Sequence, residues 1–217
     1  MTRRSLSKPA PARRGPTPRG ISKETPAAAT HASELDARGS SGHYERLRHV
    51  RELVRAVPDF PSPGILFRDI TPVLADPKAF HMVIDAFVER FIGERIDAVV
   101  AIDSRGFIFG APLASRLNTR FVPARKPGKL PCETVSVEYA LEYGRAALEM
   151  HKDALPEGSN VVVIDDLLAT GGTAGAAGEL VLAQGANVAA YAFVIELAAL
   201  GGRAKLEPTP IVSLIHF

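Results

Sequence analysis

From residue 98 onward, hydrophobic residues form short uninterrupted runs, and helical patterns fill two of the intervals between them. The runs have the length and β-branched content that are typical of buried strands. Five such runs occur, at residues 98–102, 121–124, 161–164, 188–195 and 211–215. Helical spacing follows the first and third runs, over 106–117 and 174–184. This alternation predicts an α/β fold with a mostly parallel central sheet flanked by helices.

Two more helices and a proline-rich loop are expected before the first strand. The first helix is predicted from apolar residues at helical spacing that end at Pro58, namely Leu47, Val50, Val54 and Val57. Residues 58–72 contain four prolines, so we expect a shaped loop with one short extended piece. The second helix is expected to begin at Asp76 or Pro77, because an apolar face recurs from Phe80 to Phe91.

Residues 134–151 interrupt this pattern with a strand-like alternation. Val135, Val137 and Tyr139 occupy every second position, and Tyr143-Gly144 supplies a turn. The alternation predicts a hairpin inserted over the rim of the sheet, as a hood above its edge.

The first 43 residues differ in composition from the rest of the chain. They contain five prolines, no aromatic residue and only three of Ile, Leu or Val. So little apolar surface does not offset the entropy of ordering, and we predict a disordered basic extension over 1–43 and one domain over 44–217. The prolines also break the amphipathic helix that a transit peptide needs.

Charge is distributed unevenly along the 217 residues, whose net charge is +2. The extension has eight basic and three acidic residues, or +5, which leaves 18 basic and 21 acidic residues, or −3, for the domain. Nucleic-acid binding by the domain is therefore not expected, since it requires clustered surplus cations. No run of about 18 apolar residues suggests a membrane span. The lone Cys132 fits a reducing compartment, so a cytoplasmic location is expected.

The strongest chemical signal is the sequence VVVIDDLLATGGT at residues 161–173. A buried strand delivers Asp165 and Asp166 to its end, and five residues with little side-chain bulk then lead into a helix. Such a loop can direct consecutive backbone N–H groups at one phosphate, helped by the helix N-terminus. The two carboxylates suit the hydroxyls of a sugar. Other phosphate motifs fail, because the chain lacks both the Gly-Lys-Ser/Thr of a Walker loop and GxGxxG.

These residues resemble the phosphoribosyl diphosphate (PRPP) motif of type I phosphoribosyltransferases. PDFPSPGILFRDITPVL, DSRGF, RKPGKLP and LEYG, in this order, resemble the adenine phosphoribosyltransferases in particular. The resemblance covers about residues 44–217 and implies the type I phosphoribosyltransferase fold. It also implies transfer of a phosphoribosyl group from PRPP to adenine, giving AMP and pyrophosphate with Mg²⁺ held mainly through PRPP. A homodimer is implied by the resemblance alone, and no metal-binding residue is assigned.

The resemblance assigns roles to individual residues. It implies catalytic roles for Glu142, Arg105, Asp165 and Asp166. It implies binding of PRPP or AMP by Ala169, Thr170, Gly171, Gly172, Thr173, Ser104, Arg105, Arg125, Lys126, Lys129 and Tyr143. It implies binding of adenine by Leu66, Phe67, Arg68 and Leu167.

Two alternatives to the adenine reaction stay open at this point. One is a sister transferase that uses hypoxanthine, xanthine or orotate as the base. The other is a non-catalytic regulator that senses PRPP. Against the regulator, the LEYG hood and the basic loop 125–129 are both present, and a pure sensor needs neither of them.

Overall fold

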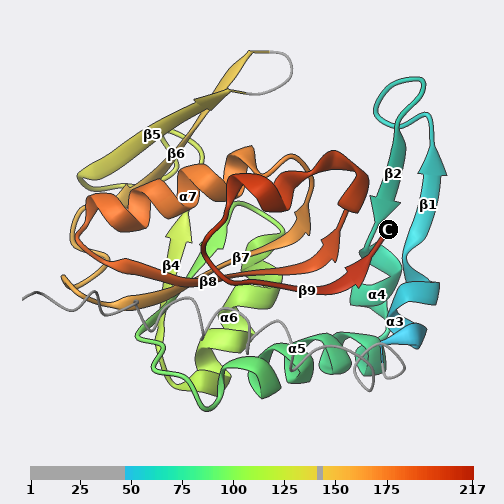
Figure 1. The fold of residues 1–217 in the computed structure, drawn as a ribbon, viewed down its shortest axis with the longest axis horizontal. Helices are drawn as coiled ribbons and strands as arrows, with labels where there is room; N and C mark the ends of the chain where they lie inside the picture. Colours follow the sequence, from blue (N-terminus) through green and yellow to red (C-terminus); the bar gives the residue numbers. More distant parts are fainter. Residues whose placement is uncertain (1–46, 141–143) are drawn as a thin grey trace, which may run out of the picture.

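A parallel five-stranded sheet forms the centre of the molecule. The structure is a computed structural model that describes residues 47–140 and 144–217. The strand order is β4-β3-β7-β8-β9, and every neighbouring pair is parallel (Figure 1). The strands are β3 (Ala98–Ile102), β4 (Arg120–Ala124), β7 (Asn160–Leu168), β8 (Asn187–Glu196) and β9 (Ile211–His216). The five strands and the fold class predicted from the apolar runs are confirmed.

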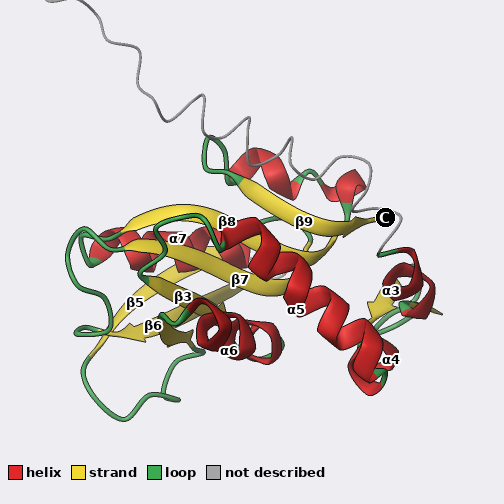
Figure 2. Cartoon of the chain, turned by 90° about the horizontal axis from the view of Figure 1, so that it is seen from below, coloured by secondary structure: helices red, strands yellow, loops and turns green. Residues whose placement is uncertain are grey.

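Helices cover both faces of this sheet, as Figure 2 shows. Helices α5 (Pro77–Phe91) and α6 (Gly106–Leu117) lie on one face, and α7 (Gly172–Ala183) lies on the other. Alternate residues of β7 enter the two cores: Val162 and Ile164 join α5 and α6, while Val161 and Val163 join α7. Because both faces are buried, the strands need the continuous apolar sequence from which they were predicted.

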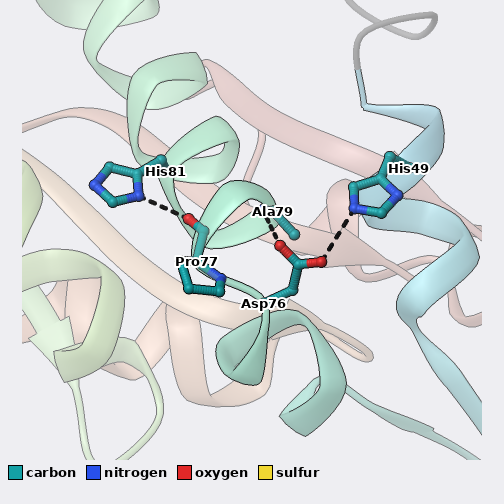
Figure 3. Close-up of polar contacts among 5 residues, drawn as sticks. All are labelled: His49, Asp76, Pro77, Ala79 and His81. Atoms are coloured by element: carbon teal, nitrogen blue, oxygen red, sulfur yellow. Dashed lines mark hydrogen bonds and ion pairs between the residues drawn. The ribbon is translucent and has the colours of Figure 1, made fainter.

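The start of α5 is fixed by one side chain. Asp76 is the N-cap, and its Oδ1 accepts a hydrogen bond of 2.9 Å from the Ala79 amide (Figure 3). Its other oxygen lies 3.3 Å from Nε2 of His49, on helix α3 (Arg48–Leu53). The Ala79 hydrogen bond lowers the pKa of Asp76, and the contact with His49 adds to this effect. Asp76 thus joins α3 to α5, and the predicted helix start is confirmed.

A two-stranded antiparallel ribbon replaces the end of the first predicted helix. Helix α3 ends at Leu53, and β1 (Arg55–Pro58) pairs with β2 (Leu66–Asp69) in the proline-rich segment. The prediction of one helix through Val57 is therefore wrong, because pairing with a strand eight residues beyond Pro58 outweighs local helical spacing. Strand β2 is the short extended piece expected in the loop. Helix α4 (Thr71–Ala75) follows it.

The predicted hairpin consists of β5 (Thr134–Ala140) and β6 (Arg145–His151), which are antiparallel. The ribbon and the hairpin stand at opposite ends of the sheet in Figure 1. Leu148 and Met150 of the hairpin are buried in the core that α7 forms with the sheet. The hairpin therefore packs on the same side of the sheet as α7.

Two short 3₁₀ turns connect β8 to β9. They are η1 (Ala198–Leu200) and η2 (Gly202–Lys205). Across 47–140 and 144–217, we find no helix that combines the length and the apolarity of a membrane span.

Candidate functional site

Two acidic residues lie inside the last part of β7. The strand continues to Leu168, whereas the sequence suggested that it ends at Asp165 and Asp166. It extends further because β8 pairs with it as far as Leu168, which lies opposite Glu196. As a result Asp166 is buried, with 2% of its surface exposed, rather than sitting at an exposed strand end.

Asp166 forms an ion pair with Arg105, the residue before α6. Nε of Arg105 lies 2.8 Å from Oδ2 of Asp166, and the Arg105 side chain is 47% exposed. That oxygen is buried and receives no aligned hydrogen bond. Burial raises the pKa of Asp165 well above its usual value, and the charge of Asp166 raises it further. The pair therefore forms an acidic centre with one adjacent cation at the carboxyl edge of the sheet.

The phosphate loop, residues 169–173, follows β7 directly and leads into α7. Gly171 is the N-cap of α7 and has a left-handed conformation with φ of 79°, which glycine adopts without strain. A hollow of about 180 Å³, here called the loop hollow, is lined by Arg105 and residues 165–174. Backbone N–H groups at the start of a helix favour anions, so this hollow has the chemistry of a phosphate site.

A second hollow of about 250 Å³ adjoins the first. It is called the Ser104 hollow here, and it is lined by Asp103, Ser104, Arg105, Lys126, Asp165 and Asp166. Three of these residues also line the loop hollow: Arg105, Asp165 and Asp166. The two hollows are therefore parts of one site, with the acidic pair and Arg105 between them.

The basic residues of loop 125–129 have different surroundings. Lys126 lines the Ser104 hollow. Arg125 instead pairs with Asp103, at 3.1 Å from Nε to Oδ2, and donates to the carbonyl oxygen of Lys129 at 3.1 Å. The side chain of Lys129 is exposed. The structure thus brings Lys126 to the site and holds Arg125 beside it through Asp103.

The residues expected to bind a base lie on β2 and β7. Leu66 of β2 is 49% exposed, so it is not a core residue. The Phe67 ring lies 5.1 Å from the Phe60 ring in an edge-on arrangement, and Cζ of Arg105 lies 5.8 Å from its centroid. Phe67 therefore borders the site beside Arg105.

Arg68 and Leu167 complete this set. The Arg68 guanidinium stacks on the Phe217 ring, with 4.0 Å from Cζ to the centroid. Leu167 lines the loop hollow and packs against the core on the α5 and α6 face. Arg68 thus contacts the last residue of the chain, while Leu167 belongs to the site.

The predicted hood is described only in part. Glu142 and Tyr143 lie outside the described residues, so the roles expected of them stay predictions. The neighbouring end of β5 reaches α7, since a Cβ atom at Gly172 would lie 3.5 Å from the carbonyl oxygen of Ala140. The hairpin therefore borders the phosphate loop at the first residue of α7.

Two acids that order the basic loop had no role predicted from the sequence. Asp103 holds Arg125, and Glu149 of β6 accepts a hydrogen bond of 3.1 Å from the Gly128 amide. Arg125 and Glu149 also exchange backbone hydrogen bonds of 2.8 and 2.7 Å. Asp103 stands in the DSRGF motif and could have been noticed there, but Glu149 lies in the hairpin and carries no local signal.

The carboxylates of the site fit Mg²⁺ only as supplementary partners. Within the parts of the chain that the structure describes, no group of three or more His, Cys, Asp or Glu residues could hold a metal. Mg²⁺ commonly uses one or two carboxylates together with phosphate oxygens and water. Asp166 Oδ2, buried without an aligned donor, can accept a metal-bound water.

Comparisons with known proteins agree with this geometry. A model of the phosphoribosyl transferase domain matches residues 73–209. The adenine phosphoribosyltransferase of Sorangium cellulosum is 57% identical over 176 residues, which cover 79% of this chain and 88% of that protein. That of Anaeromyxobacter dehalogenans is 58% identical over 168 residues, which cover 77% of this chain and 98% of that protein.

Solved structures show the same likeness. The adenine phosphoribosyltransferase of Thermoanaerobacter pseudethanolicus has a TM-score of 0.77 at 53% identity, covering 79% of this chain and 99% of that one. The Saccharomyces cerevisiae enzyme, in a complex with an imino-altritol bisphosphate and adenine, has a TM-score of 0.75 at 45% identity, covering 78% and 98%. Identity at this level over nearly the whole of each relative makes the assignment specific: the chain belongs to the adenine phosphoribosyltransferase family.

Proposed function

We propose that the protein transfers the 5-phosphoribosyl group of PRPP to N9 of adenine, giving AMP and pyrophosphate. The observation that carries this proposal is the pair of adjoining hollows that share Arg105, Asp165 and Asp166. One hollow is bordered by a phosphate loop and the other by a cationic loop. PRPP has the matching arrangement, because its ribose lies between a monophosphate and a diphosphate.

The loop hollow would hold the 5′-phosphate, and the acidic pair would hold the ribose. Residues 169–173 offer the phosphate backbone N–H groups and the hydroxyls of Thr170 and Thr173. Asp165 and Asp166 would accept hydrogen bonds from the ribose 2′ and 3′ hydroxyls. The negative charge of this pair, which need not be shared equally by the two carboxyls, also favours the positive charge that develops at C1 as the leaving group departs.

The Ser104 hollow would hold the diphosphate. Arg105 and Lys126 would provide positive charge, and α6 begins one residue after Arg105, so its N-terminus faces this end of the sheet. Mg²⁺ bound to PRPP would neutralise charge on the diphosphate. Arg125 and Lys129 are proposed to contribute to the same hollow when the substrate is bound, with Asp103 keeping Arg125 near it.

Adenine would lie beside Phe67 and Leu167, with Leu66 and Arg68 on the same strand as Phe67. A slot of apolar side chains and backbone groups suits a neutral purine. In the reaction the bond from C1 to the diphosphate breaks, its electron pair leaves with pyrophosphate, and C1 bonds to N9. Glu142 is proposed to accept the N9 proton, with Tyr143 beside it in the hood.

Three further features belong to this proposal. The protein is proposed to act as a homodimer and in the cytoplasm. Residues 1–43 are proposed to form an extension separate from the catalytic domain at 44–217. Sedimentation of the full chain would test the first of these, and a domain lacking residues 1–43 with unchanged turnover would support the third.

A base-competition assay tests the reaction. The protein is incubated with PRPP, Mg²⁺ and either adenine, hypoxanthine, xanthine or orotate, and both the nucleotide and pyrophosphate are measured. We expect AMP and pyrophosphate in equal amounts with adenine, at a rate far above that of the other bases. An equal or faster rate with another base would identify a sister transferase, and PRPP binding with no pyrophosphate release would identify a regulator.

A further inference from the structure

The segment that follows β8 lies directly against the phosphate loop. This segment, residues 198–206, is called the strap here. A Cβ atom at Gly171 would lie 2.6 Å from the carbonyl oxygen of Gly202, and one at Gly202 would lie 2.9 Å from the Gly171 nitrogen. The two backbones therefore touch with no side chain between them. Gly202 therefore limits the space that the backbone of Gly171 can occupy.

An ion pair between a partly exposed arginine and a buried glutamate holds the strap to the sheet. Glu196, the last residue of β8, is 6% exposed. Arg203 of η2 donates from Nε to its Oε1 at 3.1 Å and from Nη2 to its Oε2 at 2.8 Å. This two-bond fork fixes the orientation of the guanidinium as well as its distance. Because Arg203 directly follows Gly202, the fork also fixes the backbone that contacts the phosphate loop.

The far end of the strap is anchored by packing. Leu206 is 4% exposed and belongs to the core beneath α7, where its Cδ2 would lie 3.9 Å from a Cβ atom at Gly175. Gly175 in turn donates to the carbonyl oxygen of Gly171 at 2.9 Å. The part of the strap that follows Gly202 is thus held twice, by the ion pair at Arg203 and by the apolar packing of Leu206.

The phosphate loop needs a restraint of this kind. Gly171 caps α7 without a side-chain hydrogen bond, and its conformation is one that glycine leaves easily. Backbone N–H groups bind a phosphate well only when the loop is already in the binding conformation, since ordering it on binding lowers the affinity. The contact with Gly202 is placed where it can supply that order.

We propose that Arg203, through its fork to Glu196, is a positioning residue that holds the strap against the phosphate loop and so sets the affinity for the 5′-phosphate of PRPP. The inference rests on the proposed function, which assigns the 5′-phosphate to this loop. Arg203 acts through Gly202 and Gly171 and does not itself bind the substrate.

The experiment compares Arg203→Ala and Arg203→Lys with wild type in the full-length protein. Two probes divide the site: ribose 5-phosphate reports on the loop hollow, and pyrophosphate with Mg²⁺ reports on the Ser104 hollow. Calorimetry should show ribose 5-phosphate binding weakened about tenfold in Arg203→Ala, because the phosphate loop would then have to be ordered on binding, with pyrophosphate binding unchanged. Arg203→Lys, which keeps the charge but not the fork, should show a smaller loss.

Steady-state kinetics give a second readout. The KM for PRPP should rise in Arg203→Ala while the KM for adenine stays within about twofold of wild type, a split that loss of overall stability would not produce. Arg116→Ala serves as the control, because it breaks an exposed ion pair of 2.9 Å with Asp85. We expect the control to bind both probes as wild type does.

Two results with Arg203→Ala would overturn the proposal. One is an equal loss of affinity for ribose 5-phosphate and for pyrophosphate, and the other is no loss of affinity for either. If Arg203→Ala does not fold, Gly202→Ala tests the same contact with the ion pair intact, and its Cβ should produce the same selective loss of ribose 5-phosphate. A wild-type protein that does not bind PRPP at all would overturn the proposed function and the inference with it, whereas tight PRPP binding in every variant would overturn the inference alone.

Discussion

Replacing Asp166 with asparagine should greatly reduce turnover while leaving the stability of the fold almost unchanged. Removing one partner of a fully buried ion pair destabilises a protein by about 3–5 kcal/mol. Here the Arg105 side chain is 47% exposed and stays hydrated without its partner, so the loss should be closer to about 1 kcal/mol. The substitution also ends the repulsion between Asp166 and Asp165 and removes a buried charged oxygen that lacks an aligned donor.

These gains and losses are similar in size, so we expect the free energy of unfolding of Asp166→Asn to lie within about 1 kcal/mol of wild type. Turnover should fall by about a hundredfold, because an amide gives less electrostatic stabilisation to the positive charge developing on the ribose. Urea unfolding and pyrophosphate release measure the two effects. Carboxyl ¹³C NMR should show a lower pKa for Asp165 in the variant, since one cause of its rise is gone. An unchanged Asp165 pKa, or a stability loss of about 3 kcal/mol or more, would refute this reasoning.

Three other predictions concern neighbouring residues. Gly171→Ala should weaken PRPP binding by about tenfold or more and lower the melting temperature, because its φ of 79° and the nearby strap exclude a side chain. Gly172→Ala is the control: a Cβ atom there has ordinary contacts, so this variant should bind PRPP nearly as wild type does. Equal affinities in both variants would contradict this. Lys126→Ala should weaken pyrophosphate binding more than Lys129→Ala in direct titrations, and the reverse order would show that the loop rearranges around the ligand. The pKa of Asp165 is raised in the folded state, so the folded protein binds the carboxyl proton of Asp165 more tightly than the unfolded chain does. Wild type therefore loses stability as the pH rises above about 4, and Asp165→Asn should gain stability relative to it over that range. A pH-independent difference in urea unfolding would be the contrary result.

The central sheet could be predicted because the residues within each strand already indicate a buried strand. Each strand of the sheet is a nearly continuous apolar run, and a strand buried on both faces needs that composition whatever its neighbours are. The end of α3 could not be predicted in the same way. Val54 and Val57 fit a helix locally, but Val57 lies opposite Phe67 in the ribbon, and that pairing depends on a segment ten residues away.

In the candidate site, too, only the features with a local sequence signal could be predicted. The phosphate loop and the acidic pair are adjacent in the sequence, so the sequence alone predicts that they lie together. The burial of Asp166 could not be predicted from the sequence, because it depends on how far β8 extends along β7. The contact of Gly202 with Gly171 joins residues 31 positions apart, and nothing in either local sequence indicates that the two glycines meet.

The net charge of residues 44–217 shows why binding of the proposed substrate depends on where a few charged groups lie. The domain at 44–217 has a net charge of −3, yet the proposed substrate is a polyanion. The proposed attraction comes from a few local groups: the N-termini of α6 and α7 and Lys126 at its two ends, and Arg105, which lines both hollows. The two carboxylates lie between these ends, where a phosphate would be repelled but sugar hydroxyls can donate hydrogen bonds. In the proposed reaction the acids would therefore not oppose substrate binding. They would fix its register, because a ligand with a neutral hydroxylated centre and anionic ends suits both hollows at once.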